Sequence, residues 1–182
     1  EFDENLRLMC KLGITHADIW PTPHVPDSKE RWQKAGVSFY GTFQEPLFAS
    51  SADKYADPRN YFVGLDGKRV QGTKNYRNSP YCPSATARPG SDIFQELLKT
   101  IQDQAKDGVE YIYSDHEIDT YSLCFCDDCR AAFATFSGAP REQVMHITPV
   151  ELIRKYPLEW YKFRAGQTSE MVRQLKAKVQ PQ

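Results

Sequence analysis

Cysteines at positions 124, 126 and 129 form a C-x-C-x-x-C cluster, the pattern in this chain with the clearest chemistry. Thiolates two and three residues apart can converge on one soft divalent ion. Cys82 lies in a long loop, and by ligand count and reach it is the fourth ligand that a closed tetrahedral zinc site needs. A disulfide and free buried thiols are the alternatives. Cys10 lies in a helix-like run, where we expect a small buried apolar residue.

Two carboxylates precede this cluster at the end of a candidate strand, residues 109–114. Asp115 and Glu117 are two residues apart, so in extended backbone they point to the same side and can face one cleft. A like-charged neighbour can raise the pKa of a carboxylic acid toward that of a proton donor. The pair is therefore a catalytic candidate, with solvated loop charges or helix caps as the alternative.

Two further residues follow candidate strands and are weaker candidates for substrate contact. Trp20 precedes a Pro-Thr-Pro-His segment and can stack on a sugar ring or pack in the core. Glu45 follows the second strand and can contact a substrate or serve as a loop charge.

A helix–glycine–strand pattern recurs at Gly13, Gly36 and Gly108. In each case a lysine and then a glycine end a helix-like segment, and a β-branched residue opens a strand. The predicted strands are residues 14–20, 37–43 and 109–114, and the predicted helices include residues 92–105, 127–136 and 157–179.

This alternation favours an α/β fold with parallel strands, arranged as one domain over residues 1–182. Residues 44–90 form a long insertion after the second strand, and within it residues 61–70 predict a hairpin that turns at Asp66-Gly67. A closed eight-stranded barrel needs about 250 residues, so 182 residues can form only part of one.

The charge composition limits the classes of binding partner that the sequence favours. With 23 basic and 24 acidic residues, the net charge of −1 gives no general attraction to nucleic acid or to an anionic membrane. No apolar run approaches the roughly 20 residues that span a bilayer. The acidic start is unlike a signal peptide, and the thiol-rich motif slightly favours the cytoplasm.

The chain also resembles a known family. Tyr81-Cys82-Pro83 in a long loop, an Asp-x-Glu strand end, the C-x-C-x-x-C cluster followed by Ala-Ala-Phe, and Trp160-Tyr161-Lys162-Phe163-Arg164 together resemble glycoside hydrolase family 42 β-galactosidases. The resemblance covers roughly residues 5–180. It implies a section of a (β/α)8 TIM barrel, roughly its second to fourth units. It also implies Glu117 as the acid/base and a structural zinc on Cys82 and the three clustered cysteines.

The chain departs from the family pattern in two ways. His116 stands where the family has an Asn that contacts the sugar, so His116 is a candidate for substrate binding. A retaining glycosidase also needs a second carboxylate about 5 Å from the first, and by resemblance that nucleophile lies outside this chain.

We therefore expect a fragment of a hydrolase that cleaves O-glycosidic bonds in a β-galactoside-like carbohydrate, with Asp115 orienting Glu117. The fragment alone is expected to be inactive and to need the remainder of the barrel or a homo-oligomer. The alternatives are a catalytically inactive, zinc-stabilised carbohydrate-binding or interaction module, and a lyase that uses the same acidic strand end.

Overall fold

The computed structural model describes residues 2–18, 28–42, 54–69, 81–106, 109, 111–113 and 124–179. The chain divides into two compact units. Unit 1 comprises residues 1–44 and 100–115, and unit 2 comprises residues 45–99 and 116–182. The long helix α5 (Asp92–Lys106) contributes to both.

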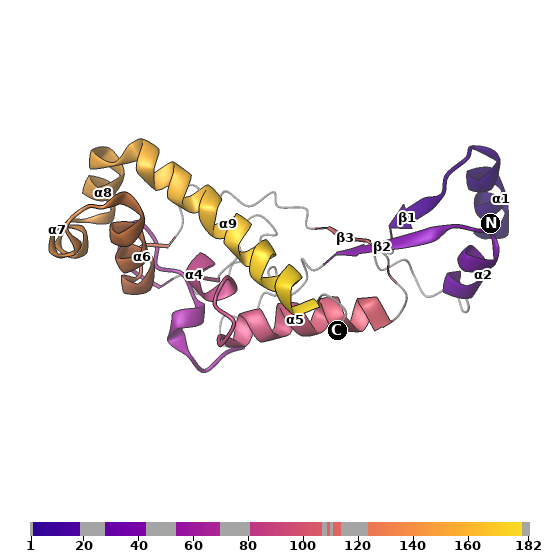
Figure 1. Ribbon diagram of the computed structural model, residues 1–182, viewed down its shortest axis with the longest axis horizontal. Helices are drawn as coiled ribbons and strands as arrows, with labels where there is room; N and C mark the ends of the chain where they lie inside the picture. The colour runs from indigo at the N-terminus through magenta and orange to yellow at the C-terminus, as the bar shows by residue number, and fades with distance from the viewer. Residues whose placement is uncertain are drawn as a thin grey trace. The chain divides into compact units, whose positions relative to one another are not determined.

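Unit 1 contains a small parallel sheet in the order β1-β2-β3 (Figure 1). In the register of this sheet, His16 lies opposite Ser38 and Tyr40 lies opposite Tyr111. The other elements of unit 1 are two helices that precede β1 and β2. The bounds are α1 (Phe2–Lys11), β1 (His16–Asp18), α2 (Ser28–Lys34), β2 (Ser38–Thr42) and β3 (Tyr111–Tyr113).

The predicted glycine stops are confirmed for the first two helices. Gly13 and Gly36 have φ of 74° and 76°, in the left-handed region that glycine adopts without a steric penalty. The turns after α1 and α2 bring Leu6, Ala17 and Val37 together as a small core. Each strand of this core is thus positioned by the helix that precedes it.

Unit 2 is predominantly helical in its described residues. The helices are η1 (Pro58–Asn60), α4 (Pro83–Thr86), the N-terminal part of α5, α6 (Asp127–Ser137), α7 (Arg141–His146), α8 (Pro149–Lys155) and α9 (Pro157–Val179). Acidic residues in the first turn and a left-handed glycine, Gly138 with φ 71°, bound α6. A capping box between Thr148 and Glu151 opens α8.

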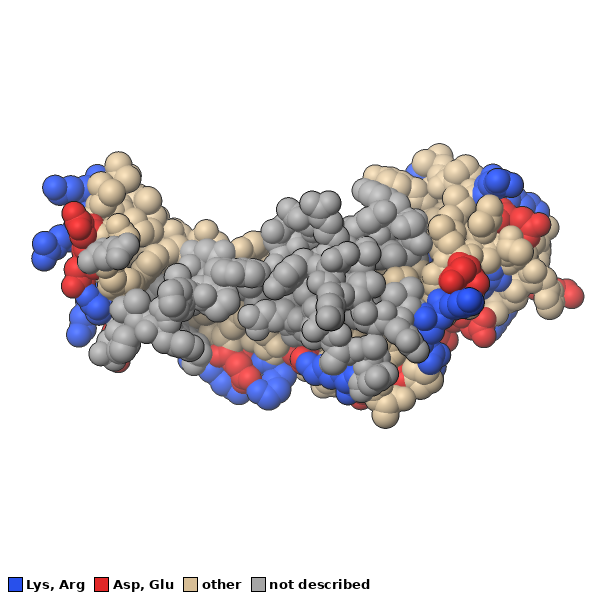
Figure 2. All heavy atoms as spheres, turned by 180° about the vertical axis from the view of Figure 1, so that it is seen from behind, with Lys and Arg blue, Asp and Glu red and all other residues tan. Residues whose placement is uncertain are grey.

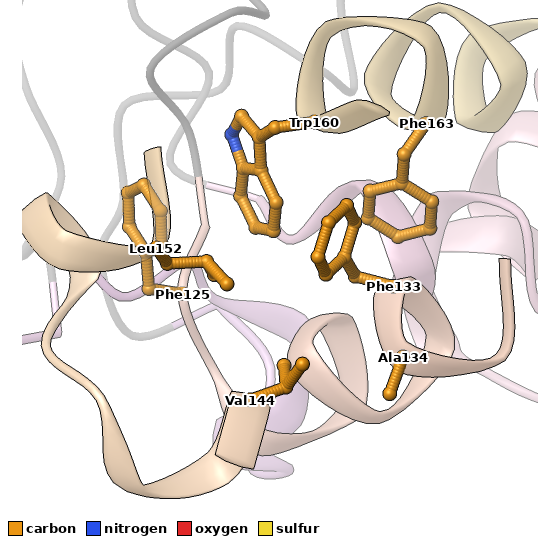
Figure 3. Close-up of a cluster of buried hydrophobic side chains, with 7 residues drawn as sticks. All are labelled: Phe125, Phe133, Ala134, Val144, Leu152, Trp160 and Phe163. Atoms are coloured by element: carbon orange, nitrogen blue, oxygen red, sulfur yellow. The ribbon is translucent and has the colours of Figure 1, made fainter. Parts of the chain in front are cut away.

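The larger core belongs to unit 2 and lies between α6, α7, α8 and α9 (Figure 3). Its members are Phe125, Phe133, Ala134, Val144, Leu152, Trp160 and Phe163. The rings of Phe125 and Trp160 stack with centroids 4.9 Å apart, and Phe133 meets Trp160 edge to face at the same separation. Such aromatic pairs stabilise beyond the area they bury.

The predicted hairpin is also confirmed. Val63 pairs with Arg69 in an antiparallel bridge, and the Lys68 carbonyl accepts from the Gly64 N–H at 2.8 Å. Gly67 has φ 73°, and the Asp66 carboxylate accepts from the Lys68 N–H at 3.0 Å. Asp-Gly chemistry therefore sets the turn, as the sequence indicates.

The expected α/β fold, as part of a (β/α)8 barrel, is wrong. Most described residues are helical, and the strands are only three to five residues long. Barrel strands are covered on both faces, yet Tyr111 and Tyr113 of β3 are 59% and 36% exposed. The larger core forms among helices and contains no residue of the sheet. The prediction of one domain over residues 1–182 with an insertion at 44–90 stays a prediction.

The described surface carries charges of both signs. On the face shown in Figure 2, Lys and Arg side chains are interspersed with Asp and Glu. The chain as a whole has 23 basic and 24 acidic residues. Among the described helices, none has the combination of length and apolar character needed to cross a membrane.

Candidate metal centre

Cys82 is held by the end of η1 and the start of the hairpin in unit 2. It directly precedes α4, and its backbone N–H donates to the carbonyl of Asn60 at 2.8 Å. The neighbouring Tyr81 pairs with Tyr61 in an isolated antiparallel bridge. The backbone around Cys82 is thus fixed independently of its thiol.

The other three cysteines lie just before α6 and in its first turn. Cys124 has φ 62°, an uncommon left-handed conformation for a side chain other than glycine. Phe125 donates its N–H to the carbonyl of Val63 at 2.8 Å, which joins this segment to the hairpin. Cys126 is the N-cap of α6, and its sulfur accepts from the N–H of Cys129 at 3.5 Å. Helix capping and the left-handed residue together direct the three thiols inward.

The four sulfur atoms all lie within 4.8 Å of one another. The Sγ of Cys82 is 3.6 Å from that of Cys126 and 3.4 Å from that of Cys129. Four thiolates about 2.3 Å from one zinc ion stand roughly 3.8 Å apart in a tetrahedron, whereas a disulfide joins sulfurs about 2.05 Å apart. All four cysteines are free. The predicted ligand set therefore lies together and could hold a metal ion.

Burial makes this a closed site. Cys82, Cys124 and Cys129 are at most 1% exposed, and Cys126 is partly buried. With four protein ligands around a tetrahedral ion, no coordination position is left for water or substrate. That is the arrangement of structural rather than catalytic metal sites.

The thiols differ in their affinity for protons. The hydrogen bonds that the Cys82 thiol makes with Cys124, Cys126 and Cys129 favour its protonated form and raise its pKa, and burial raises the pKa further. Burial is also the main cause of the raised pKa of Cys124. The pKa of Cys126 is lowered, chiefly by its hydrogen bond with Cys124. Burial alone raises the pKa of Cys129, but hydrogen bonds from the other thiols and the charge of Arg164 hold it well below its ordinary value. Because metals bind thiolates, metal uptake must release the remaining protons.

Polar side chains that spacing did not predict surround Cys129. The Ser84 hydroxyl lies 3.1 Å from its sulfur, the Nη1 of Arg164 3.6 Å and the Nε2 of Gln167 3.9 Å. The Trp160-to-Arg164 segment is part of the family resemblance, but its sequence does not predict contact with the cysteines. Nothing in its spacing indicates a buried cation, because α9 meets the cysteines only through tertiary packing.

An open groove of about 480 Å³ lies beside the centre, between the hairpin and the start of α6. Several of the charged side chains that line this groove already form ion pairs or hydrogen bonds within the protein. Arg59 pairs with Asp57, and Asp128 pairs with Arg88. Arg130 donates to three backbone carbonyls. The cysteine cluster, rather than the groove, is therefore the candidate functional site.

The residues predicted to do chemistry or to contact substrate lie outside the described residues. They are Glu117 and Asp115 as catalytic candidates, and Trp20, Glu45 and His116 as substrate contacts. Their roles stay predictions.

No protein family, no curated protein and no solved structure matches this chain. The geometry of the four thiols is therefore the main indication of function in this chain.

Proposed function

We propose that Cys82, Cys124, Cys126 and Cys129 bind one zinc ion, and that the ion is a structural centre of unit 2. The observation that carries the proposal is the convergence of four free thiols, most of them fully buried, within 4.8 Å. Soft thiolate ligands in a tetrahedral set favour zinc over the hard cations magnesium and calcium.

The ion would join segments that are remote in sequence. Cys82 belongs to the loop before α4, whereas the other ligands lie at and before the start of α6. Both α4 and α6 contact α9. A metal bound here would hold these elements together, and its binding free energy would contribute directly to folding.

Elemental analysis of purified protein tests this proposal, with Cys82→Ser as the test variant and Cys10→Ser as the control. Cys10 is exposed, so the expectation that it is buried is wrong, and it lies outside the cluster. We therefore expect about one zinc per chain in the wild type and in Cys10→Ser. Cys82→Ser should lose the zinc or bind it much more weakly. A metal-free wild type with its cysteines in disulfides contradicts the proposal.

Glycoside hydrolysis is a second candidate function, and one observation favours it. The family resemblance implies Cys82 as the partner of the C-x-C-x-x-C trio, and these are the four cysteines that lie together. On this hypothesis Glu117 protonates the leaving oxygen and then acts as base, Asp115 orients it, and the nucleophile lies outside this chain. Trp20, Glu45 and His116 would contact the sugar.

Substitution of Glu117→Gln tests the second candidate, in a chain long enough to supply the second carboxylate. Hydrolysis of an aryl β-galactoside should fall by about 10²- to 10⁴-fold, with sugar binding retained and the Cys10→Ser control unaffected. A chain that binds sugar or a protein partner but never hydrolyses the glycoside supports the alternative, a catalytically inactive zinc-stabilised module.

A further inference from the structure

Arg164 of α9 is a buried cation next to the cysteine cluster. It is 1% exposed, and its Nη1 lies 3.6 Å from the sulfur of Cys129. The same nitrogen donates to the side-chain oxygen of Gln167, and its Nη2 donates to the carbonyl of Cys124. The guanidinium carbon lies 4.3 Å from the ring centre of Trp160.

No carboxylate among the described residues forms an ion pair with this guanidinium. A buried charge without a partner is strongly destabilising. Four thiolates around one divalent cation carry a net charge of −2, and one of their sulfurs, that of Cys129, lies 3.6 Å from Arg164 Nη1. The cation and the metal centre therefore have complementary charges.

We propose that Arg164 is the counter-ion of the thiolate–metal centre, a positioning residue that tunes the affinity of the cysteines for the metal. This inference rests on the proposed zinc site. The positive charge reduces the net charge of the buried centre from −2 to −1. Its N–H groups also withdraw electron density from the Cys129 sulfur and fix the carbonyl of Cys124.

A small network directs the guanidinium toward Cys129. Gln167 accepts from Arg164 and donates through Nε2 to the Ser84 hydroxyl at 2.7 Å. Ser84 in turn lies 3.1 Å from the Cys129 sulfur. Three polar groups from α4 and α9 thus meet at one thiolate, so the electron density on the Cys129 sulfur depends on these groups.

Arginine suits this position better than lysine. Its planar fork lets one nitrogen reach a sulfur while the other reaches the backbone of Cys124, and its flat face packs over Trp160. A lysine would keep the charge but lose the second hydrogen bond and the stacking. Comparison of arginine with lysine at position 164 therefore separates the effect of charge on metal affinity from the effect of hydrogen-bond geometry.

The test uses zinc affinity from competition with a chelator, and the sulfur-to-cobalt charge-transfer band of the Co²⁺-substituted protein. Arg164→Met should weaken zinc binding by about 10- to 100-fold, the usual effect of losing a hydrogen-bonding partner of a metal ligand. The charge-transfer band should move to longer wavelength, because a more electron-rich sulfur gives up an electron more easily. Arg164→Lys should lie between this variant and the wild type.

Arg130→Met is the matched control. Arg130 is also buried, but its guanidinium donates to the carbonyls of Val144, Met145 and Ile147 and to no sulfur. It should change stability while leaving the cobalt band in place. An Arg164→Met protein with wild-type zinc affinity and an unshifted band overturns the inference. A wild type that binds neither metal overturns the zinc site as well.

A second pair of variants decides the question if Arg164→Met does not fold. Arg164→Gln keeps a hydrogen-bond donor at this position without the charge, whereas Arg164→Lys keeps the charge. Weaker zinc binding in Arg164→Gln than in Arg164→Lys supports the inference, and equal zinc affinity in the two variants overturns it.

Discussion

Cys124 has a positive φ, which residues other than glycine rarely adopt. Hydrogen bonds from neighbouring segments explain how this conformation is kept. A left-handed conformation costs an L-residue roughly 1–2 kcal/mol, and φ is 62° here. The carbonyl of Cys124 accepts from Arg164, and the next residue, Phe125, donates to Val63. Both bonds hold the peptide group between Cys124 and Phe125, so they fix the backbone on the C-terminal side of the strained residue. Strain of this kind persists where the neighbouring structure over-determines it, often at functional sites.

Phe133 is the residue through which the core of unit 2 is most readily tested. It is fully buried and meets the rings of Trp160, Phe163 and Tyr156 at centroid distances of 4.9, 5.6 and 5.7 Å. Phe133→Ala should lower the free energy of unfolding by about 3–5 kcal/mol, because it removes apolar contacts and leaves a cavity.

Urea unfolding followed by tryptophan fluorescence, with metal present in excess, measures this loss. The control is Phe136→Ala on the same helix, where the side chain is 51% exposed and the expected change is about 0.5 kcal/mol. Equal losses in the two variants would mean that Phe133 is not at the centre of the core.

At the scale of elements, local signals predicted helices well. The expected helices at 92–105, 127–136 and 157–179 correspond to α5, α6 and α9 within one or two residues, because apolar periodicity, capping residues and terminal glycines all act locally. The short helices α7 and α8 were not predicted, although Thr148 and Glu151 have the spacing of a capping box.

The arrangement of these elements was not predictable in the same way. Helix–glycine–strand repeats set the ends of elements, but they do not say which helices cover a sheet. The aromatic residues of α6 and α9, such as Phe133 and Trp160, pack with one another and not on strands, and this decides the fold. In the metal site, Cys82 could be predicted as the fourth ligand from the ligand count alone, because a structural zinc ion binds four ligands. Arg164 could not be foreseen, since its environment exists only once α9 has packed.

At the scale of the whole molecule, removal of the metal should affect the two units differently. The apparent binding free energy of a structural zinc, about 10–16 kcal/mol in small zinc-binding peptides, is comparable to the total stability of a domain, about 5–15 kcal/mol. Unit 1 has its own core of Leu6, Ala17 and Val37 and supplies none of the four ligands. We therefore expect a chelator to open unit 2 first.

Hydrogen exchange with and without a chelator checks this expectation. Amides of the hairpin at 61–69, of α6 and of the first half of α9 should lose protection, while those of α1 and β2 keep theirs. Restoring zinc should restore protection, whereas magnesium, which prefers oxygen ligands, should not. Uniform loss of protection across both units would contradict this expectation, because it would mean that the metal centre also stabilises unit 1.

The division of the chain into two units has a consequence for dissection of the protein. Unit 1 takes residues 1–44 and 100–115, so any continuous piece that contains all of it also contains residues 45–99 of unit 2. A piece that contains all of unit 2 likewise carries residues 100–115. No single cleavage point separates the units, and neither can be expressed whole as an uninterrupted stretch free of the other. Cys82 precedes residues 100–115 and Cys124 follows them. A chain truncated within residues 100–115 therefore lacks Cys124, Cys126 and Cys129, three of the four clustered thiols.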